Sequence, residues 1–168
     1  MNKKLKIAIL GMGYVGLPLA VEFGKKYQTI GFDIDNIKIK NLKKYIDINN
    51  EINKQSIKRS ANLEFSNKIR DLEDSNVFII TVPTPLKQSN IPDLSMLTSS
   101  CKQVSKIIKK HSIVIIESTV YPGVTEEICA PLIEKYSGFI FNKDFYMGYS
   151  PERINPGDKK NPLKNINK

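Results

Sequence analysis

The 168-residue sequence lacks any apolar run close to the roughly 20 residues that a membrane-spanning helix needs. Its first residues are basic and then apolar, as in a secretion signal, but the apolar stretch is short and glycines follow it instead of a cleavage site. We therefore expect no membrane partner and interpret this beginning as a first strand.

Cysteine and histidine are scarce, since the chain contains only Cys101, Cys129 and His111. Two cysteines make neither a disulfide framework nor a metal cluster, and such scarcity is typical of a reducing compartment. We expect a cytoplasmic protein that binds no metal. Both cysteines fall in predicted helices and the histidine falls in a loop, so none of the three is a candidate for catalysis.

Arginine is also rare, with three arginines among 26 basic residues, although the formal charge is +9. Arginine is the side chain that best recognises phosphates and base edges, and the lysines here are scattered over polar segments. The sequence contains neither a concentrated basic stripe nor a helix-turn-helix pattern. We therefore expect no nucleic-acid partner and interpret the charge as a lysine-rich, solvated surface.

Short apolar runs alternate with amphipathic segments along the chain. The runs are rich in β-branched residues without polar alternation, which is typical of strands in a parallel sheet that is covered on both faces. Strands are predicted at residues 5–10, 29–32, 63–65, 77–82, 113–116 and 145–149. Helices are predicted at residues 16–26, 36–45, 51–58, 94–110 and 124–136, with a helical turn around residues 69–72.

This order predicts an α/β fold, a doubly wound Rossmann-type parallel sheet of about six strands with helices on both faces. We assign residues 1–153 to an NAD(P)-binding Rossmann domain and residues 154–168 to a polar tail. Two details of packing are also predicted. Asp93 caps the helix that follows it, and the second helix turns Ile37, Leu42 and Tyr45 inward.

A glycine-rich turn follows the first predicted strand, where Gly11, Gly13 and Gly16 fit the pattern G-x-G-x-x-G. The first glycine permits a tight turn, the second lets the backbone approach a diphosphate, and the third lets the helix pack closely against the strand. The amides that begin this helix favour an anion. We therefore predict a cofactor site that includes Gly11, Met12, Gly13, Tyr14, Val15 and Gly16.

Asp33 ends the second predicted strand, about 20 residues after the glycine turn. Its carboxylate can accept hydrogen bonds from the adenosine ribose, and its charge would repel the 2′-phosphate of NADP. The sequence therefore favours NAD as the cofactor. Lys38 is either a neighbour of the adenosine end of that cofactor or a solvated helix lysine.

Three further strands run into unusual segments at their carboxyl ends. Because parallel strands end at the same edge of a sheet, these segments should meet the glycine turn where the strand order reverses. The hydroxyls among them can contact a nicotinamide ribose or a water, and the final pair supplies an acid and a guanidinium fork. The residues are Val82, Pro83 and Thr84, then Ser118 and Thr119, then Glu152 and Arg153.

Five stretches of this sequence together resemble the UDP-glucose/GDP-mannose (nucleotide-sugar 6-) dehydrogenase family: GMGYVGLPLA, GFDID, VPTP, ESTVYPG and YSPERINPGD. The resemblance covers essentially the whole chain and is closest to the UDP-N-acetylmannosamine and UDP-N-acetylgalactosamine 6-dehydrogenases of polysaccharide biosynthesis. It implies an NAD-dependent oxidoreductase that oxidises the C6 alcohol of a UDP-N-acetylhexosamine to a uronate. The two hydride transfers would proceed through a cysteine thiohemiacetal and a thioester.

The resemblance also implies roles for three candidate residues. Thr119 would position the water or the cofactor, and Glu152 matches the acid–base glutamate of the family. Glu152 and Arg153 would contact the substrate, and the arginine resembles the amino-sugar branch of the family. A second glutamate of the family has no counterpart in residues 154–157, so a role that depends on it is not carried over.

Family members are much longer, and the resemblance implies a central dimerisation helix and a UDP-binding domain that carry the nucleophilic cysteine, a lysine and an asparagine. We therefore expect this chain to be an N-terminal part that binds NAD without turnover. We expect a homodimer for the full-length protein and a monomer or weak association for the isolated domain.

Two alternatives stay open. One is a stand-alone NAD-binding or sensing module, which a reading frame that ends at Lys168 would support. The other is the N-terminal half of a 6-phosphogluconate or β-hydroxyacid-type dehydrogenase, which shares the glycine-rich turn. The ESTVYPG and SPER segments favour the nucleotide-sugar interpretation over the second alternative.

Overall fold

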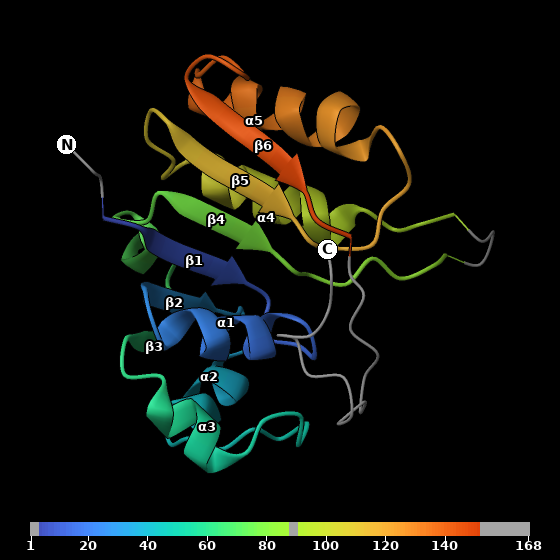
Figure 1. The fold of residues 1–168 in the computed structure, drawn as a ribbon. Helices are drawn as coiled ribbons and strands as arrows, with labels where there is room; N and C mark the ends of the chain where they lie inside the picture. Colours follow the sequence, from blue (N-terminus) through green and yellow to red (C-terminus); the bar gives the residue numbers. More distant parts are fainter. Residues whose placement is uncertain (1–3, 88–90, 152–168) are drawn as a thin grey trace.

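Six parallel strands form the centre of the computed structural model, in which residues 4–87 and 91–151 are described (Figure 1). The sheet order is β3-β2-β1-β4-β5-β6, so the order reverses between β1 and β4. The doubly wound α/β fold predicted from the sequence is confirmed. The strands are β1 (Lys6–Leu10), β2 (Gln28–Phe32), β3 (Leu63–Ser66), β4 (Val77–Ile80), β5 (Ser112–Ile116) and β6 (Phe145–Tyr149).

Helices connect these strands and pack on both faces of the sheet (Figure 1). The central strands β1 and β4 contribute side chains to two apolar layers, one against the first helices and the other against the last helices. Burial on both faces explains why the central strands carry almost no polar residues. The helices are α1 (Gly16–Gly24), α2 (Asn36–Leu42), α3 (Lys54–Arg59), η1 (Ile69–Leu72), α4 (Ser95–Ser105), η2 (Val124–Cys129) and α5 (Ala130–Ser137).

The prediction for the inward face of the second helix was right for Leu42 and wrong for Ile37 and Tyr45. Ile37 and Tyr45 are 69% and 41% exposed, whereas Ile39 and Leu42 are 3% and 1% exposed. Residues three apart share a helix face, so Ile39 joins Leu42 in the core while Ile37 lies about 140° away from Leu42 around the helix. The helix ends at Leu42, and Tyr45 lies beyond it with a positive φ of 62°.

The start of α4 also differs from the prediction, because Leu94 and not Asp93 occupies the N-cap position. Asp93 lies one residue earlier, and its Oδ1 accepts a hydrogen bond from Ser95 N at 2.9 Å. The carboxylate therefore stabilises the turn that leads into the helix. The predicted last helix begins as a π-helix, η2, before it continues as α5.

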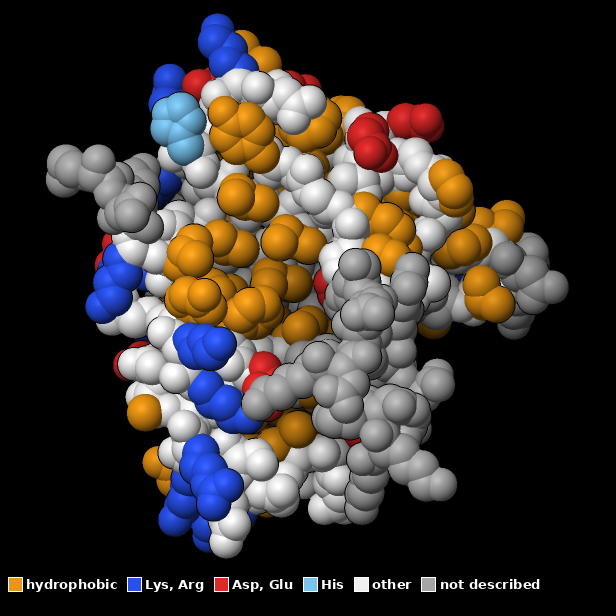
Figure 2. All heavy atoms as spheres, viewed as in Figure 1, with side chains coloured by type: hydrophobic (Ala, Val, Ile, Leu, Met, Phe, Trp, Pro, Cys, Tyr) orange, Lys and Arg blue, Asp and Glu red, His pale blue; other side chains and the backbone are white. Residues whose placement is uncertain are grey.

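One face of β5 and β6 is apolar and partly exposed in the described part of the chain. Val77, Ile113 and Tyr146 stand in register across β4, β5 and β6. Ile113 and Tyr146 are 40% and 41% exposed. Figure 2 shows hydrophobic side chains gathered over this part of the sheet.

None of the helices in the two described ranges combines the length and the apolar character that crossing a bilayer requires.

Candidate functional site

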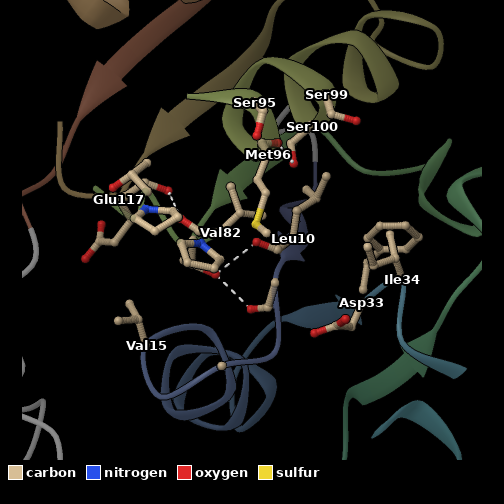
Figure 3. A pocket seen from close by; sticks show the side chains of 18 of the residues that line it. Leu10, Val15, Asp33, Ile34, Val82, Ser95, Met96, Ser99, Ser100 and Glu117 are labelled. Carbon is tan, nitrogen blue, oxygen red and sulfur yellow. Dashed lines mark hydrogen bonds between the residues drawn. The ribbon is translucent and has the colours of Figure 1, made fainter. Parts of the chain in front are cut away.

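A cavity of about 750 Å³ opens at the carboxyl ends of the central strands (Figure 3). It lies where the strand order reverses between β1 and β4, which is where ligands bind in doubly wound sheets. The start of α1 forms one wall of the cavity, Asp33 and Ile34 after β2 form another, and the start of α4 lies across from them. The volume suits a small-molecule ligand.

The glycine turn at the base of the cavity has the geometry that its sequence predicts. Gly11 has a φ of +100°, which side-chain-bearing residues rarely adopt, and its amide donates to Phe32 O at 2.8 Å. A Cβ on Gly16 would lie 1.8 Å from Gly11 O, so only glycine fits there. A Cβ on Gly13 would meet nothing within 4 Å, so the backbone at Gly13 faces open space.

The start of α1 presents hydrogen-bond donors to the cavity. The helical hydrogen bonds of this turn begin at Leu17, whose amide donates to Gly13 O at 3.1 Å, so the amides of residues 13–16 precede the helical ladder. The first turn of α1 carries no acidic residue that would compete for these donors. Tyr14 and Val15 also line this wall. The arrangement favours an anion at the helix N-terminus.

Asp33, which follows β2, forms a hydrogen bond to the glycine turn that follows β1. The residue is 8% exposed, and its carboxylate Oδ2 accepts hydrogen bonds from Met12 N at 2.9 Å and from Lys38 Nζ at 2.8 Å. The other oxygen, Oδ1, accepts from Asp35 N at 3.0 Å. A carboxylate offers about four acceptor positions, so these bonds leave capacity for a ligand hydroxyl.

Asp35 lies beside this site and caps α2. Its carboxylate accepts hydrogen bonds from Lys38 N and Ile37 N, and these bonds hold the pKa of Asp35 below its ordinary value of 3.8. The cap fixes the first turn of α2, which is the turn that carries Lys38. The position of the Lys38 ammonium next to Asp33 therefore depends on the start of this helix.

Thr81 lies just after β4, against the glycine turn. Its hydroxyl oxygen lies 2.9 Å from Leu10 O and 2.8 Å from Gly11 O, and the residue is 8% exposed. The hydroxyl therefore donates to the backbone at the end of β1. This threonine was not among the predicted site residues.

Two hydrogen bonds connect the loop after β4 to the loop after β5. Ser118 Oγ donates to Val82 O at 2.6 Å, and Thr84 Oγ1 donates to Thr119 O at 2.6 Å. These bonds use the protons of two of the three hydroxyls that were predicted to contact a ligand, those of Ser118 and Thr84. Each hydroxyl oxygen can still accept a hydrogen bond, because a hydroxyl has two lone pairs.

The cavity brings together most of the predicted cofactor residues. Met12 is an exception, because its side chain is 1% exposed in the core and only its amide serves the site. Gly16 lies beneath the turn, where it permits close packing. Glu152 and Arg153 lie outside the described residues. The predicted residues that line the cavity are Gly11, Gly13, Tyr14, Val15, Asp33, Lys38, Val82, Pro83, Thr84, Ser118 and Thr119.

One face of α4 belongs to the site and was missed. Ser95, Ser99 and Gln103 recur at helical spacing and line the cavity together, a polar stripe that the sequence already contains. Met96 from the same face and Ile34 opposite are 49% and 76% exposed and supply apolar surface. The other lining residues that were not predicted are Leu10, Phe32, Thr81, Pro85, Ser100 and Glu117.

The two cysteines lie in the core, away from the cavity. Cys101 on α4 and Cys129 at the end of η2 are both fully buried in the same apolar cluster. Their side chains are hydrogen-bonded, and this bond together with burial raises the pKa of Cys101. Neither thiol is among the residues that line the cavity, so the described residues offer no nucleophilic thiol there.

Comparison with known proteins identifies a family model that covers nearly the whole chain. Residues 5–168 match the NAD binding domain of the UDP-glucose/GDP-mannose dehydrogenase family. The chain is 52% identical, over 166 residues, to UDP-N-acetyl-D-glucosamine 6-dehydrogenase of Pseudomonas aeruginosa, a match that covers 99% of this chain and 39% of that protein.

Two solved structures are similar to the fold. The structure of UDP-D-ManNAc dehydrogenase from Pyrococcus horikoshii matches with a TM-score of 0.81 and 37% identity, over 91% of this chain and 37% of that one. The structure of NDP-N-acetyl-D-galactosaminuronic acid dehydrogenase from Methanosarcina mazei matches with a TM-score of 0.87 and 28% identity, over 98% and 37%. The chain thus spans 37–39% of the length of these three relatives.

Proposed function

The chain belongs to the UDP-glucose/GDP-mannose dehydrogenase family as its NAD-binding domain, and from this premise we propose that the cavity beside Gly13 and Asp33 holds NAD. The observation that carries the proposal is the arrangement of an open glycine backbone, a helix N-terminus and a fixed carboxylate around one cavity. These are the groups that a diphosphate and an adenosine ribose need. The residues therefore fit the cofactor.

The diphosphate binds at the start of α1. The amides of residues 13–16 donate to its oxygens, and Gly13 leaves the space in which those oxygens approach the backbone. A side chain at this position would occupy that space. The +100° turn at Gly11 directs the chain into this arrangement.

The adenosine end binds beside Asp33. The carboxylate accepts hydrogen bonds from the ribose diol, and Lys38 lies 2.8 Å from the same carboxylate, within reach of the ribose. Ile34 and Met96 provide apolar surface for the adenine ring. The negative charge of Asp33 favours NAD over NADP, because the extra phosphate of NADP would lie beside it.

The nicotinamide end lies toward the loops after β4 and β5. Val82, Pro83 and Thr84 form one side of this region, and Ser118 and Thr119 form the other. When NAD is bound there, it accepts a hydride from a substrate carbon. The hydrogen bonds between the two loops fix the shape of the pocket around the ring.

For the whole protein we propose oxidation of the C6 alcohol of a UDP-N-acetylhexosamine to a uronate, in two NAD-dependent steps, for polysaccharide biosynthesis. The support is the 52% identity to UDP-N-acetyl-D-glucosamine 6-dehydrogenase. Thr119 positions the water or the cofactor, Glu152 serves as acid and base, and Glu152 and Arg153 contact the sugar nucleotide. These roles rest on the family motifs, as does a homodimeric state for the full-length protein.

Isothermal titration of the 168-residue chain with NAD tests the cofactor proposal. We expect saturable binding, with NADP binding at least tenfold more weakly. A correctly folded chain, verified by circular dichroism, that fails to bind NAD at millimolar concentration would refute the proposal.

Turnover is the second test, because the cysteines that the chain contains are buried away from the cavity. We expect the 168-residue chain to produce no NADH from UDP-N-acetylglucosamine or UDP-N-acetylmannosamine. Steady production of NADH by this chain would show that the described cavity already holds a complete active site.

A further inference from the structure

We propose that Thr81 is a positioning residue for cofactor binding: with Asp33, it clamps the peptide group that joins Gly11 to Met12 and thereby sets the diphosphate loop before the ligand arrives. This inference rests on the proposed NAD site. Thr81 itself acts through the backbone of the turn.

The clamp is visible in the hydrogen bonds of one peptide group. The carbonyl of Gly11 lies 2.8 Å from Thr81 Oγ1 and shares the single proton of that hydroxyl with Leu10 O, which lies at 2.9 Å. The amide of Met12 donates to Asp33 Oδ2 at 2.9 Å. These two groups belong to the same planar unit and point in opposite directions from it. The peptide is therefore held at both ends, from β4 on one side and from β2 on the other.

This peptide needs such a restraint because it follows a glycine, the residue type with the greatest conformational freedom. Gly11 has a φ of +100°, and Gly13, two residues later, also lacks a side chain. A glycine backbone can rotate through many conformations, so the orientation of its peptide is not fixed by sterics alone. Rotation of this peptide would carry the following amides away from the cavity.

Burial strengthens both hydrogen bonds of the clamp. Thr81 and Asp33 are each 8% exposed, so water competes little for the hydroxyl and the carboxylate. A loop that is already ordered loses less conformational entropy when it binds a ligand. The clamp therefore raises the affinity for a ligand that contacts the diphosphate loop. It leaves unchanged the affinity for a ligand that makes no contact with this loop.

The same hydroxyl also fills the space that two glycines leave. A Cβ on Gly16 would lie 2.4 Å from Thr81 Oγ1, and one on Gly11 would lie 3.2 Å from it. The threonine hydroxyl is thus packed between the turn and the start of α1. Replacement by valine keeps the shape but removes the donor, and replacement by alanine removes both.

The experiment compares Thr81→Val, Thr81→Ala and Thr81→Ser in the 168-residue chain. Isothermal titration measures the affinity for NAD and for ADP, both of which contain a diphosphate. NMR competition measures the affinity for adenosine, which contains no phosphate. We expect Thr81→Val and Thr81→Ala to bind NAD and ADP about 3- to 10-fold more weakly, since one hydrogen bond contributes about 1 kcal/mol. Serine should restore affinity, and adenosine should bind all variants alike.

Thr29→Val is the matched control, because Thr29 is also a buried threonine whose hydroxyl donates to a backbone carbonyl, that of Tyr27 at 2.9 Å. It lies near the start of β2, at the opposite edge of the sheet from the cavity. We expect this variant to lose thermal stability while its affinity for NAD stays unchanged. All titrations are made well below the melting temperatures measured by circular dichroism.

Three results would overturn the inference. The first two are unchanged NAD affinity in both Thr81→Val and Thr81→Ala, and an equal loss in Thr29→Val. A loss of adenosine affinity equal to that of NAD would also overturn it, because the effect would then not act through the diphosphate loop. Failure of the unaltered chain to bind NAD is a different outcome, since it removes the proposed function itself and this inference with it.

Discussion

Thr81 and Asp33 hydrogen-bond to opposite ends of one peptide group, the one between Gly11 and Met12. They come from the ends of β4 and β2, which are the two strands that flank β1 in the sheet. The turn that follows β1 is therefore held by its neighbours on both sides. A ligand at this turn meets a backbone that the sheet has already ordered.

Two glycines of the turn should respond differently to alanine. Gly16→Ala places a Cβ 1.8 Å from Gly11 O, so we expect it to lower the free energy of unfolding by about 1–3 kcal/mol or more. Gly13→Ala meets no protein atom within 4 Å, so we expect stability within about 1 kcal/mol of the original but loss of NAD binding. Urea denaturation and isothermal titration separate the two effects. Normal NAD affinity in Gly13→Ala would place the diphosphate elsewhere.

Removal of the Asp33 charge should weaken NAD and relax the discrimination against NADP. Asp33→Asn loses an ionised acceptor for the ribose and for Met12 N, so we expect NAD affinity to fall about 10-fold or more. The control is Asp35→Asn, which removes a neighbouring charge from the same turn but keeps a residue that caps α2 well. Equal losses in both variants would mean that general electrostatics, and not the ribose contact, govern affinity.

Acid should destabilise the fold through carboxylates that accept hydrogen bonds. Backbone amides hold the pKa of Asp35 and of Asp144 below the ordinary value of 3.8, through Lys38 N and Ile140 N respectively. Because the folded pKa is the lower one, their contribution is present above the unfolded pKa and is lost as the pH falls through the folded value. We expect the denaturation midpoint in urea to drop between about pH 5 and about pH 2.

The double variant Asp35→Asn/Asp144→Asn provides the comparison for this acid effect. It should show a smaller drop over the same pH range, because two of the titrating groups are absent. An identical drop in the variant and the original chain would assign the effect to other groups.

The buried thiols should be protected until the chain unfolds. Cys101 and Cys129 are both 0% exposed, and the pKa of Cys101 is raised by its hydrogen bond to Cys129 and by burial. A thiol reagent such as DTNB should therefore react slowly with the native chain at about pH 8 and rapidly with both cysteines in urea. Rapid labelling of the native chain would show that the α4–η2 region opens readily.

The strands were predictable because most of their residues are apolar, on both faces of the sheet. In β5, Val114 and Ile116 face one apolar layer while Ile115 packs against the other. Its sequence therefore lacks polar alternation, which is the pattern that predicts a strand of a parallel sheet. Asp33 was predictable for a similar reason, since it ends a strand at a set distance from the glycine turn. The apolar pattern of each strand and the spacing between the glycine turn and Asp33 can both be recognised from the sequence alone.

Other parts of the site depend on contacts that spacing does not encode. Thr81 meets Gly11 across 70 positions of sequence, and nothing near Thr81 distinguishes it from any threonine at a strand end. The polar face of α4 becomes part of the cavity only because that helix starts at the edge where the strand order reverses. The prediction that α2 turns Ile37 and Tyr45 inward was wrong, because Ile37 lies on the other side of the helix from Leu42 and because the helix stops at Leu42, before Tyr45.

Strand β1 lies in the interior of the sheet, between β2 and β4. The strand β2 follows it closely in the sequence, whereas β4 follows much later. On a ribosome, β1 and its glycine turn are made early, but the hydroxyl of Thr81 is made 70 residues after Gly11. A nascent chain that ends before β4 therefore carries the sequence fingerprint without the ordered turn. Capture of nucleotide by ribosome-bound chains of increasing length would thus report the moment at which β4 docks beside β1.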